Sequence, residues 1–265
     1  MPITCPISFK PLSTEDFGRL DYSVMASAFA THKEFGRLAD EVIYQSDFAA
    51  RLAGAEFEIS REVPVTVSFG SFSKVYLLDL VVDEKAIYEL KAVARLTSEH
   101  VAQLLNYLYL VESERGKLVN FRPASVETKF VNAPLSREHR QRFVVNEIHW
   151  NGPNVFRNLL IDLLRDWGTG LELLLYHKAI VHLLGGDERV AFVLPMTRNG
   201  ISLGNQRFFL SDPQSAFRLT ALPGDFSPYR SHVERLLQHS PLSSIHWINI
   251  DLETVTLMTI TKGSR

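Results

Sequence analysis

Cysteine is nearly absent from this sequence of 265 residues. The single cysteine, Cys5, cannot form a disulfide within the chain, and no cysteine pairs exist to build a zinc site. A chain without disulfides is typical of a reducing compartment. The first residues also lack the charged and apolar regions of a secretory signal. We therefore expect a cytoplasmic protein.

Long apolar runs and several common catalytic motifs are missing as well. The strongest candidate for a membrane span, residues 171–184, is interrupted by Glu172, His177, Lys178 and His182, so we expect no membrane association. The glycine-rich motifs that bind nucleotides and the Gly-x-Ser-x-Gly motif of serine hydrolases do not occur. Nucleotide binding and serine-based hydrolysis therefore have no support.

Charge is distributed unevenly along the chain, although the net charge is only −2. Residues 1–131 carry 14 Lys and Arg against 18 Asp and Glu, whereas residues 132–265 carry 14 against 12. Twelve of the 14 cations in the second half are arginines, whose planar guanidinium suits phosphate. The second half is therefore a candidate for holding an anionic substrate. Ordinary surface arginine is the alternative.

The stretch from 75 to 93 contains charged residues inside apolar segments. Residues 75–82 are typical of a buried strand but include Asp79, a polar turn follows at 83–85, and residues 86–93 form a second strand with Glu89 and Lys91. Side chains two apart on a strand share a face. Charges in such strands need partners, and a divalent metal is one, because Mg²⁺ prefers carboxylate oxygens. A cross-strand ion pair on a half-exposed sheet is the alternative.

Residues 32–121 resemble the GxxExxY family, a branch of the PD-(D/E)XK nuclease superfamily. The opening motif of that family is matched by His32, Phe35, Gly36, Glu41 and Tyr44. The metal-binding hairpin matches at Asp79, Glu89, Leu90 and Lys91, the following helix at Gln103 and Tyr107, and the next strand at residues 117–121. Leu38 stands where the family has its second glycine, which puts the turn before Glu41 in doubt.

The resemblance implies a nuclease with a metal-dependent mechanism. Asp79 and Glu89, helped by the carbonyl of Leu90, would hold Mg²⁺ or Mn²⁺, and Lys91 would position the attacking water and stabilise charge on the phosphate. The substrate would be nucleic acid, DNA in preference to RNA. The alternative is a non-catalytic nucleic-acid-binding or assembly protein that retains the fold.

Four further residues receive supporting roles from the resemblance. Glu41 would bind a second metal or a metal-bound water. His32 would add an imidazole ligand; alternatively, it is simply an exposed residue ahead of a helix. Gln103 and Tyr107 lie four apart on one helix face. They would contact the scissile strand or brace Lys91, although a tyrosine at this spacing also fits a core position.

The order of predicted elements indicates an α/β fold of the restriction-endonuclease type, with a mixed sheet flanked by helices. Residues 1–20 are expected to be irregular, 21–35 helical, 56–72 extended and 125–131 a strand. Residues 137–142 are expected to form a charged, exposed link.

The second half repeats this order with different chemistry. Trp167 and Gly168 align with Phe35 and Gly36, an offset of 132, and Tyr176 aligns with Tyr44. The six proposed site positions Glu41, Asp79, Glu89, Lys91, Gln103 and Tyr107 become Leu173, Phe208, Arg218, Thr220, Arg235 and His239. We therefore expect a nuclease domain at 1–131 and a degenerate, inactive repeat at 132–265. The repeat would complete a pseudo-dimer, hold nucleic acid or stabilise its neighbour, and a homodimer is also open.

Overall fold

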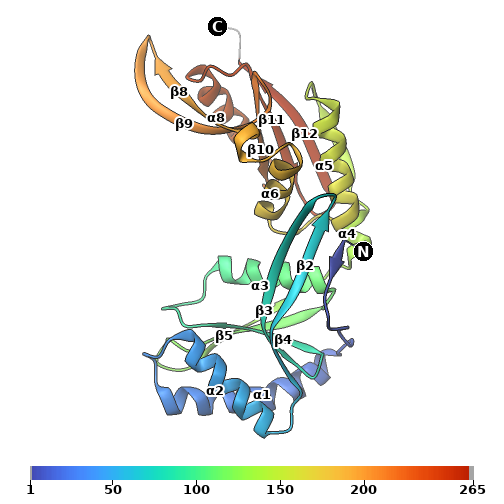
Figure 1. Ribbon diagram of the computed structural model, residues 1–265, viewed down its shortest axis with the longest axis vertical. Helices are drawn as coiled ribbons and strands as arrows, with labels where there is room; N and C mark the ends of the chain where they lie inside the picture. Colours follow the sequence, from blue (N-terminus) through green and yellow to red (C-terminus); the bar gives the residue numbers. More distant parts are fainter. Residues whose placement is uncertain (1, 263–265) are drawn as a thin grey trace. The chain divides into compact units, whose positions relative to one another are not determined.

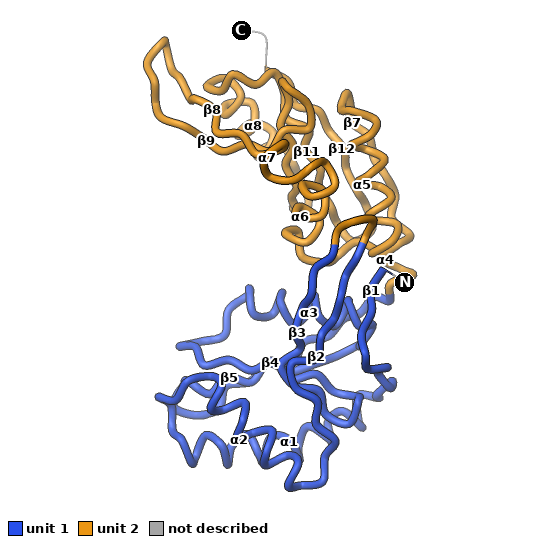
Figure 2. The backbone as a smooth tube through the Cα atoms, in the orientation of Figure 1, with its two compact units in different colours: residues 1–68, 73–136 blue, residues 69–72, 137–265 orange. Residues whose placement is uncertain are grey.

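The chain divides into two compact units, each of which contains one six-stranded mixed sheet flanked by helices. A computed structural model describes residues 2–262. Unit 1 comprises residues 1–68 and 73–136, and unit 2 comprises residues 69–72 and 137–265 (Figure 2). The predicted α/β fold class is confirmed. In the described part of the chain, no helix has the length and apolar character needed to cross a membrane.

Unit 1 has the strand order β1-β2-β3-β4-β5-β6. Strands β4 and β5 are parallel, while β1–β2, β3–β4 and β5–β6 are antiparallel. The elements are β1 (Ile3–Thr4), α1 (Thr14–Phe35), α2 (Glu41–Gly54), β2 (Ile59–Phe69), β3 (Phe72–Val82), β4 (Ala86–Lys91), α3 (Ser98–Val111), β5 (Arg115–Asn120) and β6 (Glu127–Asn132).

Helices cover both faces of this sheet (Figure 1). On one face, α1 and α2 pack their buried residues, such as Val24 and Phe48, against Leu90 and Phe121. On the other face, α3 lies so close to β5 that a side chain at Gly116 would meet Leu104 and Leu108 at 3.2–3.3 Å. Because side chains alternate along a strand, Glu89 and Lys91 lie on the face covered by α3.

The start of the chain is more ordered than the sequence indicated. We expected an irregular lead-in up to residue 20, but β1 pairs with β2, and α1 begins at Thr14. The side chain of Ser13 accepts a hydrogen bond from the amide of Asp16 and caps the helix, as serine commonly does at this position.

Unit 2 has the strand order β7-β12-β11-β10-β9-β8, in which β10–β11 and β7–β12 are parallel pairs. Its elements are α4 (Arg137–Gln141), β7 (Val144–Ile148), α5 (Asn154–Trp167), α6 (Leu173–Leu183), α7 (Asp187–Val190), β8 (Ala191–Arg198), β9 (Ile201–Asp212), β10 (Ser215–Thr220), α8 (Ser227–Gln238), β11 (Ser244–Ile250) and β12 (Thr254–Thr261).

The prediction of a charged, exposed link at 137–142 holds for Glu138, His139 and Arg142 but was wrong for Arg140. Residues 137–141 form α4, and the Arg140 side chain is fully buried. Its Nη1 donates hydrogen bonds to the carbonyl oxygens of Trp167 and Thr169. A buried guanidinium is tolerable when backbone carbonyls accept its hydrogen bonds.

The parallel strand pairs of the two units share one register, although β7 lies parallel to β12 without a counterpart in unit 1 and the β9–β10 pairing is irregular at Ser215 and Ala216. The parallel pairing of Lys91 with Asn120 in unit 1 recurs as Thr220 with Asn249 in unit 2. Both asparagines bind the chain that follows the central strand: Asn120 exchanges two hydrogen bonds with Val93, and Asn249 exchanges two with Leu222. Thr220, Leu222 and Asn249 thus follow Lys91, Val93 and Asn120, respectively, by 129 residues.

The helix pairs of the two units are linked by the same tyrosine contact. The Tyr44 hydroxyl donates to the Gly36 carbonyl and accepts from the Ala39 amide. The Tyr176 hydroxyl donates to the Gly168 carbonyl and accepts from the Leu171 amide. Each tyrosine thus closes the turn between two helices, and here the offset is 132 residues.

Candidate active site

The candidate site lies where β3 and β4 separate. Their antiparallel pairing runs from Val82–Ala86 to Leu80–Tyr88, and the next step of this register sets Asp79 opposite Glu89. Directly opposed residues on neighbouring strands share a face. The hairpin therefore brings Asp79, Glu89 and Lys91 to one face, as the period-two pattern predicted.

Beyond this pairing, carboxylates bind backbone amides of β4 and of the residue that follows it. Asp79 Oδ2 accepts from the amide of Leu90 at 2.8 Å, and Glu41 Oε2 accepts from the amide of Ala92 at 3.1 Å. Glu41 is the first residue of α2, so the helix end is joined to the end of the strand. The contacts fix two carboxylates on either side of Lys91.

Lys91 is the cation of the cluster. Its Nζ donates to Glu89 Oε1 at 2.6 Å and lies 4.0 Å from Asp79 Oδ2. Burial alone would lower the pKa of Lys91, but the charges of Glu89, Asp79 and Glu41 outweigh it and raise the pKa. The lysine is therefore held as a protonated hydrogen-bond donor.

Glu89 is the most deeply buried member of the cluster. Its side chain is 1% exposed, and Oε2 has no hydrogen-bond partner. Burial, reinforced by the charge of Asp79 and opposed by Lys91, raises the pKa of Glu89 to about 8. Burial also raises the pKa of Asp79, against the hydrogen bond from Leu90. Without further positive charge, this site retains a proton at neutral pH.

Gln103 and Tyr107 lie together on α3, over the same face of the sheet. The Gln103 side-chain amide donates to the Tyr107 hydroxyl at 3.0 Å. The Tyr107 ring is mostly buried and packs edge-on against Tyr76 of β3, with ring centroids 5.8 Å apart. The pair is thus preassembled, whereas its proposed contact with Lys91 or with substrate stays a prediction.

His32 makes a contact of another kind. It lies in the last turn of α1, with Nε2 3.0 Å from the carbonyl oxygen of Pro123. A carbonyl oxygen only accepts, so Nε2 carries the proton, and Nδ1 is the nitrogen left for a metal. Its role as a ligand stays a prediction.

Sequence reasoning missed two residues that build the site. Asn120 also donates to Glu127 Oε2, and Arg122 Nε donates to the carbonyl of Ala92. Both follow from topology, because β5 runs parallel to β4 and its end lies at the same sheet edge. Arg122 places a second cation next to the segment that carries Lys91.

A separate buried ion pair lies on the opposite face of β4 and β5. Lys117 Nζ donates to Asp21 Oδ2 at 2.6 Å, and the Tyr88 hydroxyl donates to Asp21 Oδ1 at 3.3 Å. Both partners of the ion pair are almost fully buried. Its position between α1 and the sheet indicates a structural role.

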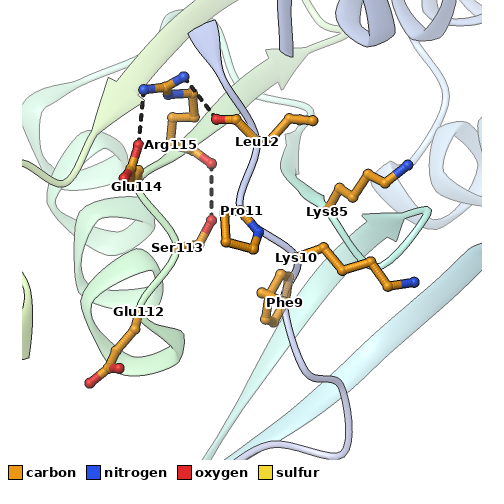
Figure 3. A pocket seen from close by; sticks show the side chains of 9 residues that line it. All are labelled: Phe9, Lys10, Pro11, Leu12, Lys85, Glu112, Ser113, Glu114 and Arg115. Atoms are coloured by element: carbon orange, nitrogen blue, oxygen red, sulfur yellow. Dashed lines mark hydrogen bonds and ion pairs between the residues drawn. The ribbon is translucent and has the colours of Figure 1, made fainter. Parts of the chain in front are cut away.

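The cavity in Figure 3 is not the candidate site. It has a volume of about 90 Å³ and lies among the N-terminal segment, the β3–β4 turn and the α3–β5 link. Its Arg115 guanidinium is occupied by the Leu12 carbonyl and by Glu114. The Arg115 side chain thus links the N-terminal segment to the sheet.

Unit 2 has no carboxylate at the equivalent positions. Phe208 and Arg218, at the positions of Asp79 and Glu89, line a cavity of about 240 Å³ together with His177 and Arg207. Thr220, at the Lys91 position, donates to Asn249.

The sequence alignment of α8 was three residues out of register. Helix α8 begins at Ser227, 129 residues after the start of α3 at Ser98. The buried residues Val233 and Leu237 then correspond to Leu104 and Leu108. Gln103 and Tyr107 consequently correspond to His232 and Leu236, and not to Arg235 and His239.

The described residues contain no group of three or more His, Cys, Asp or Glu side chains that could hold a metal ion. The protein thus offers a pair of carboxylates, with Glu41 as a neighbouring charge. A metal bound by this pair would need backbone or water oxygens to complete its shell, as Mg²⁺ commonly does.

Comparison with known proteins identifies the first unit. A family model of the PD-(D/E)XK nuclease superfamily matches residues 18–131. No curated protein and no solved structure matches the chain significantly. The matched segment contains the hairpin, α3 and the end of α2 that build the carboxylate cluster. Residues 18–131 are therefore similar to the PD-(D/E)XK nuclease superfamily.

Proposed function

We propose that unit 1 is a Mg²⁺- or Mn²⁺-dependent nuclease of the GxxExxY type that hydrolyses phosphodiester bonds, in DNA in preference to RNA. The observation that carries this proposal is the unpartnered Oε2 of Glu89, buried next to Asp79 and Lys91. A buried carboxylate oxygen without a partner is costly, and a divalent cation would satisfy it.

The residues fit such a cation. Asp79 and Glu89 would hold it with the Leu90 carbonyl, and Glu41 would serve a second cation or a water. The cation would supply Lewis acidity toward the phosphate and lower the pKa of water.

The protein side chains have their own tasks in this mechanism. Lys91, kept protonated by its carboxylate neighbours, would donate to the attacked phosphate group and stabilise its developing negative charge. The hydrogen bonds that Asp79 and Glu41 accept from the amides of Leu90 and Ala92 hold both carboxylates in place before substrate arrives. Gln103 and Tyr107 would bind the scissile strand from α3.

Unit 2 is proposed to be a degenerate copy without metal chemistry. The matching helix turns and strand register support a duplication, and Phe208, Arg218 and Thr220 replace the groups that would bind a cation. Arg218 is exposed in the cavity of unit 2, where it would suit a phosphate of a bound strand.

A cleavage assay tests the function. Single-stranded DNA, double-stranded DNA and RNA are incubated with wild type, Lys91→Ala and Glu89→Ala in Mg²⁺ or Mn²⁺. Lys129→Ala is the matched control, because Lys129 is an exposed lysine of the same sheet. Cutting that needs metal and is lost in both site variants supports the proposal. Tight nucleic-acid binding without cutting by wild type would favour the non-catalytic alternative.

A further inference from the structure

The two units differ in whether a hairpin tip covers their helix pair. In unit 2, residues 69–72, the tip of the β2–β3 hairpin, pack on the helices. The rings of Phe69 and Phe72 lie 6.3 and 5.9 Å from the ring of Trp167, and Ser71 Oγ is 3.1 Å from His182 Nε2. Trp167 is fully buried.

The equivalent surface of unit 1 is uncovered. Phe35 and Ile43 correspond to Trp167 and Leu175, which are both 0% exposed, yet Phe35 is 41% exposed and Ile43 is 43% exposed. Leu38 and Val42 beside them are exposed as well. We call these four residues the α1–α2 patch. A cluster of large exposed apolar side chains is typical of an interaction surface.

The equivalent hairpin tip, in β8–β9, is also uncovered. Arg198 pairs with Ile201 across the turn at Asn199 and Gly200, and the offset of 129 places Arg198 and Ile201 at the positions of Phe69 and Phe72. Ile201 is 67% exposed, and Val193 and Leu203 on the same hairpin are 65% and 59% exposed.

The tip and the patch differ from their counterparts in a complementary way. The tip carries Arg198 in place of Phe69, while α2 carries Asp47 in place of Ala179. Asp47 and Glu34 share one cation, Arg51, at 2.5 and 3.9 Å. On α1 and α2, two carboxylates thus share one arginine, and the tip offers an arginine beside an isoleucine. Such complementarity favours recognition.

We propose that the β8–β9 tip of one copy of this chain binds the α1–α2 patch of a second copy. Ile201 contacts Phe35 and Ile43, and Arg198 faces Glu34 and Asp47. The contact joins two different surfaces, so the assembly is either a reciprocal pair or a chain of copies. The inference rests on the repeat and does not depend on nuclease activity.

Sedimentation of the full chain over a micromolar concentration series tests the contact. Wild type is expected to self-associate. Ile201→Ser or Phe35→Ser should weaken association about tenfold or more, since each removes an apolar side chain that the contact between copies would bury. A mixture of the two variants retains one intact tip and one intact patch, so it should form a mixed dimer. Leu77→Ser, an exposed apolar residue outside both surfaces, should leave association unchanged.

Cysteine cross-linking distinguishes a second copy from a contact within one chain. In a Cys5→Ser background, Asn199→Cys on one chain and Ala50→Cys on another mark the tip and the receiving helix without removing a contact residue. A disulfide that joins the two chains in the mixture supports the proposal. A monomeric wild type without mixed cross-linking, or a disulfide that closes within a doubly substituted chain, would overturn it.

Discussion

Lys91 Nζ donates to Glu89 Oε1 over 2.6 Å, and the Glu89 side chain is only 1% exposed. The lysine is thus the principal positive charge that offsets a buried carboxylate. Arg122 donates to the carbonyl of Ala92 nearby.

Replacing Lys91 should abolish most activity without unfolding the protein. Lys91→Ala removes the donor to the phosphate, and we expect a loss of kcat of about 10²–10³-fold, the usual cost of removing one such donor. The pKa of Glu89 should rise further, because its cation is gone. Single-turnover cleavage measures the loss, and equal kcat values for Lys91→Ala and Lys129→Ala would contradict the assignment.

The activity should depend on pH through Glu89. Its pKa of about 8 means that a proton competes with the divalent cation at neutral pH. At subsaturating Mg²⁺, cleavage is expected to rise as the pH increases toward 8. Saturating Mg²⁺ should move the midpoint to lower pH. A midpoint that does not respond to the metal concentration would argue against binding at Glu89.

The stability of the metal-free protein should fall as the pH rises over the same range. Folding raises the pKa of Glu89 from 4.5 to about 8, so the folded state favours the protonated acid. Wild type should therefore lose stability relative to Glu89→Gln as the pH rises from 4.5 to 8, by about 1.4 kcal/mol per pH unit. Denaturant unfolding of both proteins with a chelator present measures the difference. If the difference in unfolding free energy between the two proteins stayed constant from pH 4.5 to 8, folding would not raise the pKa of Glu89.

The two tyrosine contacts should both stabilise their units. Tyr176→Phe leaves a buried amide and carbonyl without their hydroxyl partner, which costs about 1–3 kcal/mol, whereas the partly exposed groups freed by Tyr44→Phe can bind water, so its loss should be smaller. Both variants should lower the midpoint of the unfolding step that involves their own unit. A large loss for one variant and none for the other would show that the duplicated contact is not equivalent.

Substitutions of Asn120 and Asn249 should differ in their effect on activity, although both break the same kind of contact. Asn120→Ala frees the chain after Lys91 from its tether at Val93 and Glu127, and misplacement of the site should lower kcat about tenfold to a hundredfold. Asn249→Ala breaks the same contact in unit 2 and should leave kcat near wild type. Equal losses in the two variants would point to a general effect on folding.

Much of unit 1 could be predicted because its signals are local. The short turn after residue 82 sets the hairpin register, and the period-two pattern places Glu89 and Lys91 on one face. The buried Arg140 could not be predicted, since its carbonyl partners lie 27 and 29 residues away. The register of α8 was wrong because a shift of three residues retains the apolar face of a helix.

A calorimetric titration of Mn²⁺ into the metal-free protein tests the central claim most directly. Wild type should bind Mn²⁺, and both Asp79→Asn and Glu89→Gln should lose binding, because each removes one of the two carboxylates. Arg218→Ala, at the Glu89 position of unit 2, should bind as wild type does. No binding by wild type at millimolar metal, or binding that survives both substitutions, would contradict a metal-dependent site at Asp79 and Glu89.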